Sequence, residues 1–241
     1  TNLGAEVIGL SLEPPSCPSL FDVAKLSESC ISLRGDVCDL ATVAKVVEQY
    51  KPQVVFHLAA QSLVRLSYSE PLHTYSVNML GTLNVLEAVR RSASVCAAVF
   101  VTSDKCYENI EHVWPYREID PLGGHDPYSA SKGCAEIIIQ SYIRSFFSDR
   151  CYKRAKVASV RAGNVIGGGD WGTDRLIPDI MRALIAEIPA HIRNPQAIRP
   201  WQHVLDALNG YMMLAQELFS EKYEYQGPWN FGPSDDGMAS V

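Results

Sequence analysis

Short apolar runs rich in valine, isoleucine and phenylalanine alternate along the chain with longer amphipathic stretches. We expect strands over Glu6–Leu10, Cys30–Arg34, Val54–Leu58, Ala97–Thr102, Lys156–Arg161 and Trp229–Phe231. We expect helices over Leu40–Tyr50, Pro71–Arg91, Pro127–Phe147, Leu176–Glu187 and Val204–Phe219. Because the strand segments are apolar throughout, helices must cover both faces of the sheet. The alternation therefore predicts an α/β chain with a doubly wound parallel sheet.

Composition and charge narrow the set of partners. The 241 residues are 47% hydrophobic and carry a formal charge of −6, without a run of lysine or arginine. Nucleic acids and anionic membranes bind to basic patches, so we expect neither as a partner. No apolar stretch approaches the roughly twenty residues of a membrane span, and the cysteines lack C-x-x-C spacing. We therefore predict a soluble cytoplasmic protein with reduced cysteines and no metal site.

The two ends of the sequence depart from the expected pattern. Thr1–Gly4 looks like the end of a helix with its glycine cap, running directly into a strand. A dinucleotide-binding sheet normally opens with a strand and a glycine-rich turn, and that turn is absent here. The only glycine cluster, Gly167–Gly169, follows a much later strand. We therefore expect a first βα unit before residue 1 and a further portion after residue 241.

The strongest chemical signal is Tyr128-Ser129-Ala130-Ser131-Lys132 at the start of a predicted helix. Residues four apart share one helical face, which brings Tyr128 and Lys132 together. A lysine ammonium lowers the pKa of a neighbouring phenol, so the tyrosine can take a proton from a hydroxyl group as hydride leaves. Ser103, at the end of an earlier strand, is placed to hydrogen-bond the same hydroxyl. A tyrosine and a lysine at this spacing also occur by chance in many helices, so the flanking residues matter.

Two flanking features support a catalytic role for that motif. Asn78 lies in a long predicted helix that follows the strand end Leu58-Ala59-Ala60. Asp36 follows another predicted strand, at the point where an adenine amino group needs an acceptor. In this order and on these elements, the residues resemble the extended short-chain dehydrogenase/reductase family over nearly the whole chain.

That resemblance implies an enzyme with NAD as its cofactor. Tyr128 and Lys132 are the implied catalytic pair, with Ser103 as their hydroxyl partner. The implied cofactor contacts are Asp36 and Val37 at the adenine, Leu58, Ala59 and Ala60 at the ribose and pyrophosphate, and Asn78, Tyr128 and Lys132. NAD is preferred to NADP because no arginine is found at the end of the first predicted strand to hold a 2′-phosphate. Ser11 stands where an acid commonly binds the ribose 2′-hydroxyl, so we expect the cofactor to be held less tightly than usual. Glu13 comes two residues later.

Asp104 and Lys105 distinguish subfamilies, because elimination of water from a sugar needs an acid and a base beyond the redox residues. The pair is similar to the Asp-Glu pair of dTDP-glucose 4,6-dehydratases. By that analogy Asp104 is the general acid, and Lys105 stands at the position of the base, with Glu108 as the next candidate. A lysine base requires burial or a neighbouring positive charge. The alternative is a strand-terminal aspartate that caps a turn, followed by a solvated lysine.

Three longer segments, residues 104–109, 161–171 and 198–204, resemble the CDP-glucose 4,6-dehydratases within that family. The resemblance implies that Asn164 and Arg199 hold the substrate pyrophosphate and that Arg175 and Leu176 flank the nucleotide. It also implies conversion of CDP-glucose to CDP-4-keto-6-deoxyglucose. A GDP-mannose 4,6-dehydratase, a UDP-sugar 4-epimerase and a non-catalytic nucleotide-sugar or NAD-binding module remain as alternatives.

The same resemblance implies a division of the chain and a homodimer. Residues 1–165 are expected to form a NAD-binding Rossmann-type domain without its first strand and glycine-rich loop. Residues 166–241 are expected to contribute nucleotide-sugar-binding segments of a truncated smaller substrate domain, together with a late strand and helix of the first domain. Pairing through the two long helices over residues 71–91 and 127–147 is implied by the family and agrees with their wide apolar faces.

Overall fold

The computed structural model describes residues 4–148, 155–220, 222–234 and 238–241. The strands are β1 (Ile8–Ser11), β2 (Ile31–Arg34), β3 (Val54–His57), β4 (Ala97–Val101), β5 (Lys156–Ala162), β6 (Asn164–Ile166), β7 (Ile198–His203), β8 (Gly227–Phe231) and β9 (Met238–Ser240). The α-helices are α1 (Leu20–Val23), α2 (Leu26–Ser29), α3 (Leu40–Tyr50), α4 (Val64–Ser69), α5 (Pro71–Tyr75), α6 (Gly81–Arg91), α7 (Pro127–Phe146), α8 (Leu176–Ile185) and α9 (Val204–Phe219). Three short helices complete the set: η1 (Ser76–Leu80), η2 (Asp104–Cys106) and η3 (Tyr223–Tyr225). The helix end expected at residues 1–3 lies outside the described residues.

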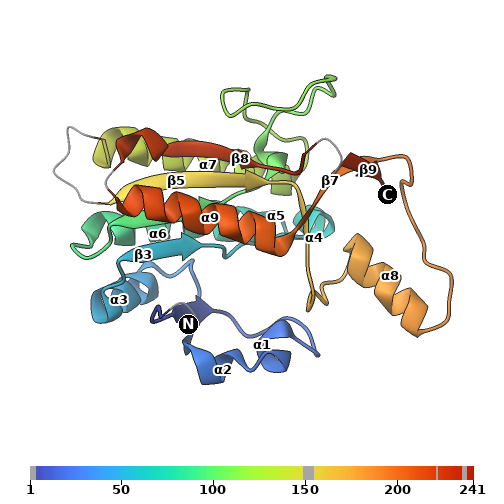
Figure 1. Cartoon of the computed structure of the whole chain (residues 1–241), viewed down its shortest axis with the longest axis horizontal. Coiled ribbons are helices and arrows are strands. Elements are labelled where there is room, and N and C mark those ends of the chain that lie inside the picture. The colour runs from blue at the N-terminus through green and yellow to red at the C-terminus, as the bar shows by residue number, and fades with distance from the viewer. Residues whose placement is uncertain (1–3, 149–154, 221, 235–237) are drawn as a thin grey trace.

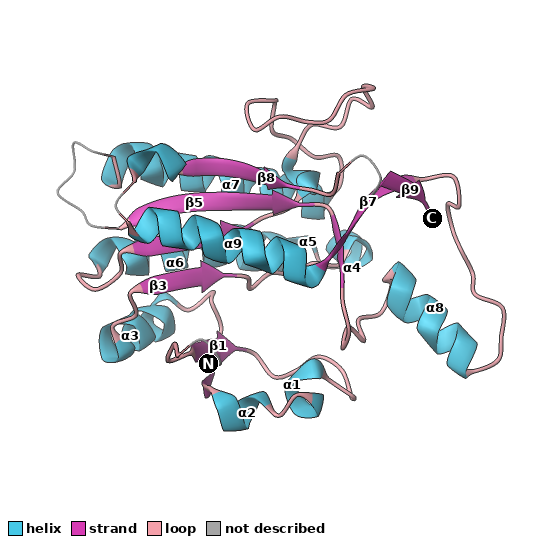
Figure 2. Ribbon diagram, in the orientation of Figure 1, coloured by secondary structure: helices cyan, strands magenta, loops and turns pink. Residues whose placement is uncertain are grey.

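The main sheet has the order β3-β4-β5-β8, and all of its strands run parallel (Figure 2). β1 and β2 form a separate parallel pair. A third small sheet joins β6 to β7 in parallel and β7 to β9 antiparallel. The predicted α/β class is confirmed, although the strands that we expected in one sheet are divided between two.

Helices cover both faces of the main sheet. In Figure 1, α9 crosses the front of the sheet, and α6 and α7 lie behind it. Side chains alternate along a strand, so Ala98 and Phe100 of β4 pack with α3, α6 and α7, whereas Ala97 and Val99 pack with α9. All four side chains are fully buried. This two-sided burial explains the apolar character of the strand segments.

The predicted elements agree with the structure to within two residues at their ends, but one predicted helix is not regular. The segment from Pro71 to Arg91 is α5, one π-helical turn, η1, and then α6. Single π-turns within α-helices are rare and commonly mark functional sites. The turn contains Asn78, which the sequence had already singled out. Among the described residues, no helix has both the length and the apolar character needed to cross a bilayer.

Candidate active site

A cleft of about 770 Å³ lies at the carboxyl edge of the main sheet, on the side of α8. Four segments line it: the start of α4, the residues after β4, the start of α7, and the chain from Gly163 through α8 and β7. The predicted residues that line it are Ser103, Asp104, Lys105, Tyr128, Asn164, Arg175, Leu176 and Arg199. Catalytic and substrate-binding candidates that are far apart in sequence therefore share one cleft, because parallel strands end at a common edge.

Ser103 and Asp104 lie where β4 ends and η2 begins. Ser103 is the N-cap of η2, and its hydroxyl oxygen accepts a hydrogen bond from the Lys105 backbone N–H at 3.2 Å. The same hydroxyl donates to Asp104 Oδ1 at 3.0 Å. Ser103 is buried and Asp104 is half-buried at the cleft wall. The hydroxyl and the carboxylate are thus held side by side.

Tyr128 lies in the first turn of α7, and local sequence fixes the start of that helix. Asp126 Oδ1 accepts from the Ser129 N–H at 3.0 Å, and Pro127 occupies the first helical position, where its missing N–H has no cost. Burial raises the pKa of the Tyr128 phenol, while its hydrogen bond with Ser103 and the charge of Arg175 oppose that rise. The net lowering expected beside a lysine is therefore wrong for this structure, since burial dominates.

Lys132 lies one turn further along α7, with only 5% of its surface exposed. Its ammonium donates to the Val101 carbonyl oxygen at 3.4 Å. Burial lowers the pKa of Lys132 to about 8, and the negative charge of Glu136 opposes this effect. Burial, followed by the charge of Lys132, lowers the pKa of His57 to about 3, so the buried imidazole is neutral. Lys132 is therefore the cation beneath the cleft floor.

A buried polar network near Ser103 and Tyr128 was not predicted from the sequence. The side chains of Glu136 and Arg161 have no exposed surface and form an ion pair at 2.7 Å. Glu136 also accepts hydrogen bonds from Thr102 and Ser159, and Arg161 donates to Tyr107 Oη at 2.7 Å. The network ties α7 to the ends of β4 and β5 and to the segment that follows η2. It therefore fixes the relative positions of the elements that carry Tyr128 and Ser103.

Lys105 lines the cleft, but its side chain is exposed. The burial expected around a lysine base is therefore absent in this structure, because the residue lies on η2 at the rim and not beneath it. Glu108, the alternative base, does not line the cleft. Its carboxylate lies against Gly123, so close that a side chain at that glycine would collide with it.

Two polar contacts join the loop before α8 to the start of α4. Arg175 donates to Ser62 Oγ at 2.5 Å and to Asp170 Oδ2 at 3.2 Å. Arg65 pairs with Asp174 at 2.7 Å. Both arginines face the cleft. The sequence analysis identified Arg175 but not Arg65, because nothing near residue 65 indicates its distant partner.

Arg199 and Asn164 lie on adjacent small strands. Asn164 of β6 is the register partner of Trp201 of β7, two residues beyond Arg199. The Arg199 guanidinium donates to the Ile198 carbonyl oxygen at 3.0 Å, and the residue lines the cleft. Gly163 permits this pairing, because a Cβ there would lie 2.5 Å from Pro200 Cγ. An amide and a guanidinium thus converge where an anionic group can bind.

Five predicted cofactor contacts follow the carboxyl ends of β2 and β3, outside the cleft lining: Asp36, Val37, Leu58, Ala59 and Ala60. Asp36 Oδ1 accepts from the Cys38 N–H at 2.8 Å, and Val37 is buried beneath it. Leu58 is 53% exposed at the end of β3, next to half-buried Ala59 and Ala60. An exposed apolar side chain beside small residues offers a wall for a flat ring or a ribose. These residues fit a dinucleotide.

Asn78 makes three hydrogen bonds within the protein, and its contact with the cofactor stays a prediction. Its Oδ1 accepts from the Gln61 N–H at 2.8 Å, and its Nδ2 donates to the Gln61 carbonyl and to Ser131 Oγ, both at 2.9 Å. The side chain is buried, and its amide is fully occupied by protein groups. Asn78 therefore positions the segment after β3 against α7.

The expectation that no arginine lies beside Ser11 is also wrong. Arg34 is the register partner of Ser11 in the β1–β2 pair, and its Nη1 donates to Ser11 Oγ at 3.2 Å. The sequence of β1 alone does not show this contact, because strand pairing brings in a residue from β2.

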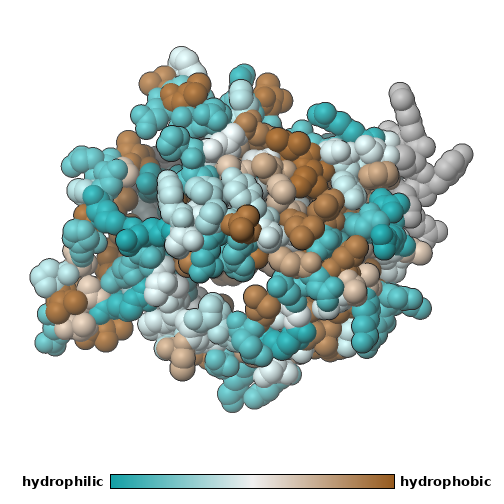
Figure 3. Space-filling model, turned by 180° about the vertical axis from the view of Figure 1, so that it is seen from behind, coloured by the Kyte–Doolittle hydropathy of each residue, from teal (hydrophilic) through white to brown (hydrophobic). Residues whose placement is uncertain are grey.

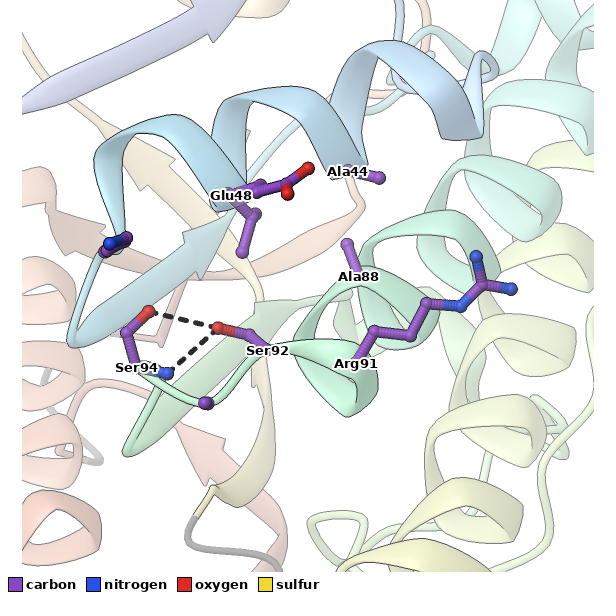
Figure 4. A pocket seen from close by; sticks show the side chains of 9 residues that line it. Ala44, Glu48, Ala88, Arg91, Ser92 and Ser94 are labelled. Carbon is purple, nitrogen blue, oxygen red and sulfur yellow. Dashed lines mark hydrogen bonds between the residues drawn. The ribbon is translucent and has the colours of Figure 1, made fainter.

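A second cavity of about 590 Å³ lies between α3 and α6, near the amino ends of β3 and β4 (Figure 4). Ala44 and Glu48 of α3 and Ala88 and Arg91 of α6 line it from its two sides. Arg91 is paired with Glu87 at 2.7 Å. None of the predicted catalytic or binding residues lines this cavity, so we assign the chemistry to the cleft.

The sequence profile of the GDP-mannose 4,6 dehydratase family matches residues 18–226, a range that contains the entire cleft lining. The chain belongs to this family. The CDP-glucose 4,6-dehydratase of Salmonella typhimurium is 50% identical over 100% of this chain, which spans 68% of that relative. The dTDP-glucose 4,6-dehydratase of Haemophilus influenzae is 27% identical over 80% of this chain and 58% of the relative. These similarities confirm the family resemblance expected from the motifs.

Solved structures agree with this family assignment at the level of the fold. The UDP-glucose 4-epimerase of Thermotoga maritima superposes with a TM-score of 0.82 at 21% identity, over 99% of this chain and 72% of that one. The dTDP-glucose 4,6-dehydratase of Bacillus anthracis, in complex with NAD, gives a TM-score of 0.79 at 19% identity, over 99% and 69%. The Rossmann-like dehydratase fold is therefore confirmed.

Proposed function

We propose that this protein is a NAD-dependent nucleotide-sugar 4,6-dehydratase that converts CDP-glucose to CDP-4-keto-6-deoxyglucose. The observation that carries the proposal is the cleft in which Ser103, Asp104, Lys105 and Tyr128 meet Asn164 and Arg199. The Salmonella typhimurium relative is named a CDP-glucose 4,6-dehydratase, and this name supports the choice of nucleotide. The pair Asp104-Lys105 favours a dehydratase, because an epimerase needs no acid and base for loss of water.

The cofactor supplies the redox chemistry: when bound, its nicotinamide takes hydride from C4 of the sugar and returns it to C6. Tyr128 acts in its phenolate form, which a neighbouring lysine ammonium favours: the phenolate oxygen accepts the proton of the C4 hydroxyl, and Ser103 hydrogen-bonds that sugar oxygen. Lys132 keeps a positive charge beneath the site. Asp36, Leu58, Ala59 and Ala60 would hold the dinucleotide at the edge of the sheet.

Elimination follows because a C4 ketone acidifies the hydrogen at C5. Lys105, as the neutral amine, removes the C5 proton, and Asp104 donates a proton to the departing C6 hydroxyl, so water leaves across C5 and C6. Lys105 then returns the proton to C5 when hydride is delivered to C6. Arg199 and Asn164 hold the diphosphate, with Arg175 and Leu176 beside the nucleotide. Residues 1–165 form the NAD-binding domain, and residues 166–241 contribute nucleotide-sugar-binding segments together with α9 and β8, which belong to the first domain.

We also propose that the enzyme acts in the cytoplasm as a homodimer that pairs through α5, α6 and α7. Nucleotide-sugar substrates and reduced cysteines are typical of the cytoplasm. Figure 3 shows apolar side chains gathered on the back of the molecule, the side on which α6 and α7 lie in Figure 1. Exposed Leu72, Leu80 and Ile137 belong to α5, to the π-turn η1 between α5 and α6, and to α7. Exposed apolar area of this kind is common at subunit interfaces.

The function is tested by incubating the protein and NAD+ with CDP-glucose, dTDP-glucose, GDP-mannose and UDP-glucose in turn. The 4-keto product is read by its absorbance in alkali and by a mass loss of one water. Turnover of CDP-glucose well above the others supports the proposal. A preference for GDP-mannose would overturn the assigned nucleotide, and a C4 epimer without loss of water would overturn the assigned reaction.

We expect the Asp104→Asn variant to oxidise C4 normally but to lose water slowly. The amide cannot donate a carboxyl proton to the leaving hydroxyl, and loss of a general acid typically slows a step by about 10² to 10⁴. Rapid-quench mass spectrometry should then find a 4-keto nucleotide sugar that retains its C6 hydroxyl. Asp170→Asn is the control, because that carboxylate also lines the cleft but pairs with Arg175. Normal turnover by Asp104→Asn would show that Asp104 is not the acid.

We expect the Lys105→Met and Lys105→Arg variants to lose exchange of the C5 hydrogen with solvent while still oxidising C4. Arginine keeps the positive charge but does not deprotonate in proteins, so it separates a base from an electrostatic neighbour. The readout is deuterium at C5 of the enzyme-bound sugar in D2O, measured by mass spectrometry. Exchange at the parent rate in Lys105→Arg would assign Lys105 a purely electrostatic role and direct the search to Glu108.

A further inference from the structure

The Arg34 guanidinium at the end of β2 is held on three sides. Its Nη1 donates to Ser11 Oγ at 3.2 Å, and its Nε faces Glu13 Oε1 at 2.9 Å. Its central carbon lies 4.8 Å from the centre of the Phe21 ring, over the ring face. The Arg34 side chain is 36% exposed and that of Glu13 is 77% exposed. Arg34 is therefore a positioned cation that remains accessible from one side.

The position of Arg34 places it at the adenosine end of the proposed dinucleotide site. It directly precedes Gly35, Asp36 and Val37, the last two being the predicted adenine contacts. In doubly wound folds an acid near the end of the second strand binds the ribose 2′-hydroxyl, whereas a nearby arginine accommodates a 2′-phosphate. In this protein the corresponding strand is β1, which ends in Ser11, and the arginine comes from the neighbouring strand β2.

Charge and geometry both favour a phosphate in this place. A guanidinium makes bidentate, charge-assisted hydrogen bonds to phosphate oxygens, and a serine hydroxyl adds a neutral donor without repulsion. The competing anion is Glu13. Its ion pair with Arg34 is largely exposed, and exposed pairs contribute little, so a phosphate dianion can displace the carboxylate.

We propose that Ser11 and Arg34 form a binding site for the 2′-phosphate of NADP(H), so that the protein binds phosphorylated as well as unphosphorylated coenzyme. Glu13 weakens this binding by competing for Arg34. The inference rests on the dinucleotide-binding part of the proposed function and adds the residues that determine coenzyme specificity.

The test is calorimetric titration of the protein with NAD+, NADP+ and 2′,5′-ADP, without any measurement of turnover. Arg34→Met should weaken the binding of NADP+ and 2′,5′-ADP by roughly tenfold or more, as expected for the loss of a hydrogen bond to a charged group. The same change should weaken the binding of NAD+ by less than about twofold. Glu13→Gln should increase the affinity for NADP+, whereas a misfolded variant would bind it more weakly. Ser11→Asp should abolish NADP+ binding and retain NAD+, because a carboxylate there repels the phosphate.

Lys25→Met is the matched control, since Lys25 is an exposed cation nine residues before Arg34 that pairs with Glu28 at 3.9 Å. It should leave all three affinities unchanged. Binding of NAD+ without NADP+, or an equal effect of Arg34→Met on both coenzymes, would overturn the proposal and leave the proposed function intact. Binding of neither coenzyme would overturn the coenzyme assignment itself, and this proposal with it.

Discussion

Replacing Tyr128 by phenylalanine is expected to reduce formation of the 4-keto sugar by about 10³-fold or more. The phenolic oxygen is the atom that accepts the C4 hydroxyl proton, and loss of a general base typically costs 10² to 10⁴ in rate. Unlike Asp104→Asn, the Tyr128→Phe variant should accumulate no oxidised intermediate, because it fails at the first step. Single-turnover reactions with CDP-glucose, quenched and analysed by mass spectrometry, measure both quantities.

Tyr142→Phe is the control for that experiment. Tyr142 lies on the same helix, and its hydroxyl contacts Glu87 at 3.4 Å, away from the cleft. This variant should turn over at the parent rate. If Tyr128→Phe retains more than a tenth of the parent rate while binding substrate normally, the assignment of Tyr128 as base is wrong.

Replacing Glu136 by leucine is expected to lower the free energy of unfolding by about 3–5 kcal/mol. The substitution leaves Arg161 as a buried charge without its partner, which is the costly way to disrupt a buried ion pair. The Thr102 and Ser159 hydroxyls also lose their acceptor. Urea denaturation followed by circular dichroism measures the change.

The double variant Glu136→Leu, Arg161→Met separates this explanation from a simple packing defect. Removing both charges removes the unpaired cation, so the double variant should be more stable than Glu136→Leu alone. Glu28→Ala is the surface control, because the Lys25–Glu28 pair is more than 70% exposed on both sides. A double variant less stable than the single one would contradict the electrostatic explanation.

Much of the fold could be predicted because local signals agree with the final structure. Helix α3 begins and ends as predicted, with Asp39 as its cap, and α9 likewise covers Val204–Phe219. The segments around Ser103, Tyr128 and Arg199 were recognised by their own sequences, and the parallel sheet brings them into one cleft. Periodicity and motif spacing carry information of this kind.

The features that could not be predicted depend on partners far away in the sequence. Arg34 matters because strand register places it beside Ser11, and Glu136 because α7 packs on the strand that carries Arg161. Neither contact can be predicted from the composition or periodicity of the nearby sequence. The exposure of Lys105 also follows from how η2 lies at the rim of the cleft. Tertiary contacts, and not local propensity, decide these positions.

The link between the two sides of the cleft has a consequence for how nucleotide preference can change. The loop before α8 is joined to the start of α4 by the Arg65–Asp174 and Arg175–Ser62 contacts, and the side chains in both are exposed. Behind the cleft, by contrast, the catalytic elements are bound together by the fully buried Glu136–Arg161 pair. Residues that select the nucleobase of the substrate can therefore be exchanged with little effect on the oxidation and reduction steps. A chimera that takes residues 163–201 from a relative with another nucleotide should fold and oxidise its new substrate, which makes this segment a natural unit for evolutionary divergence and for engineering.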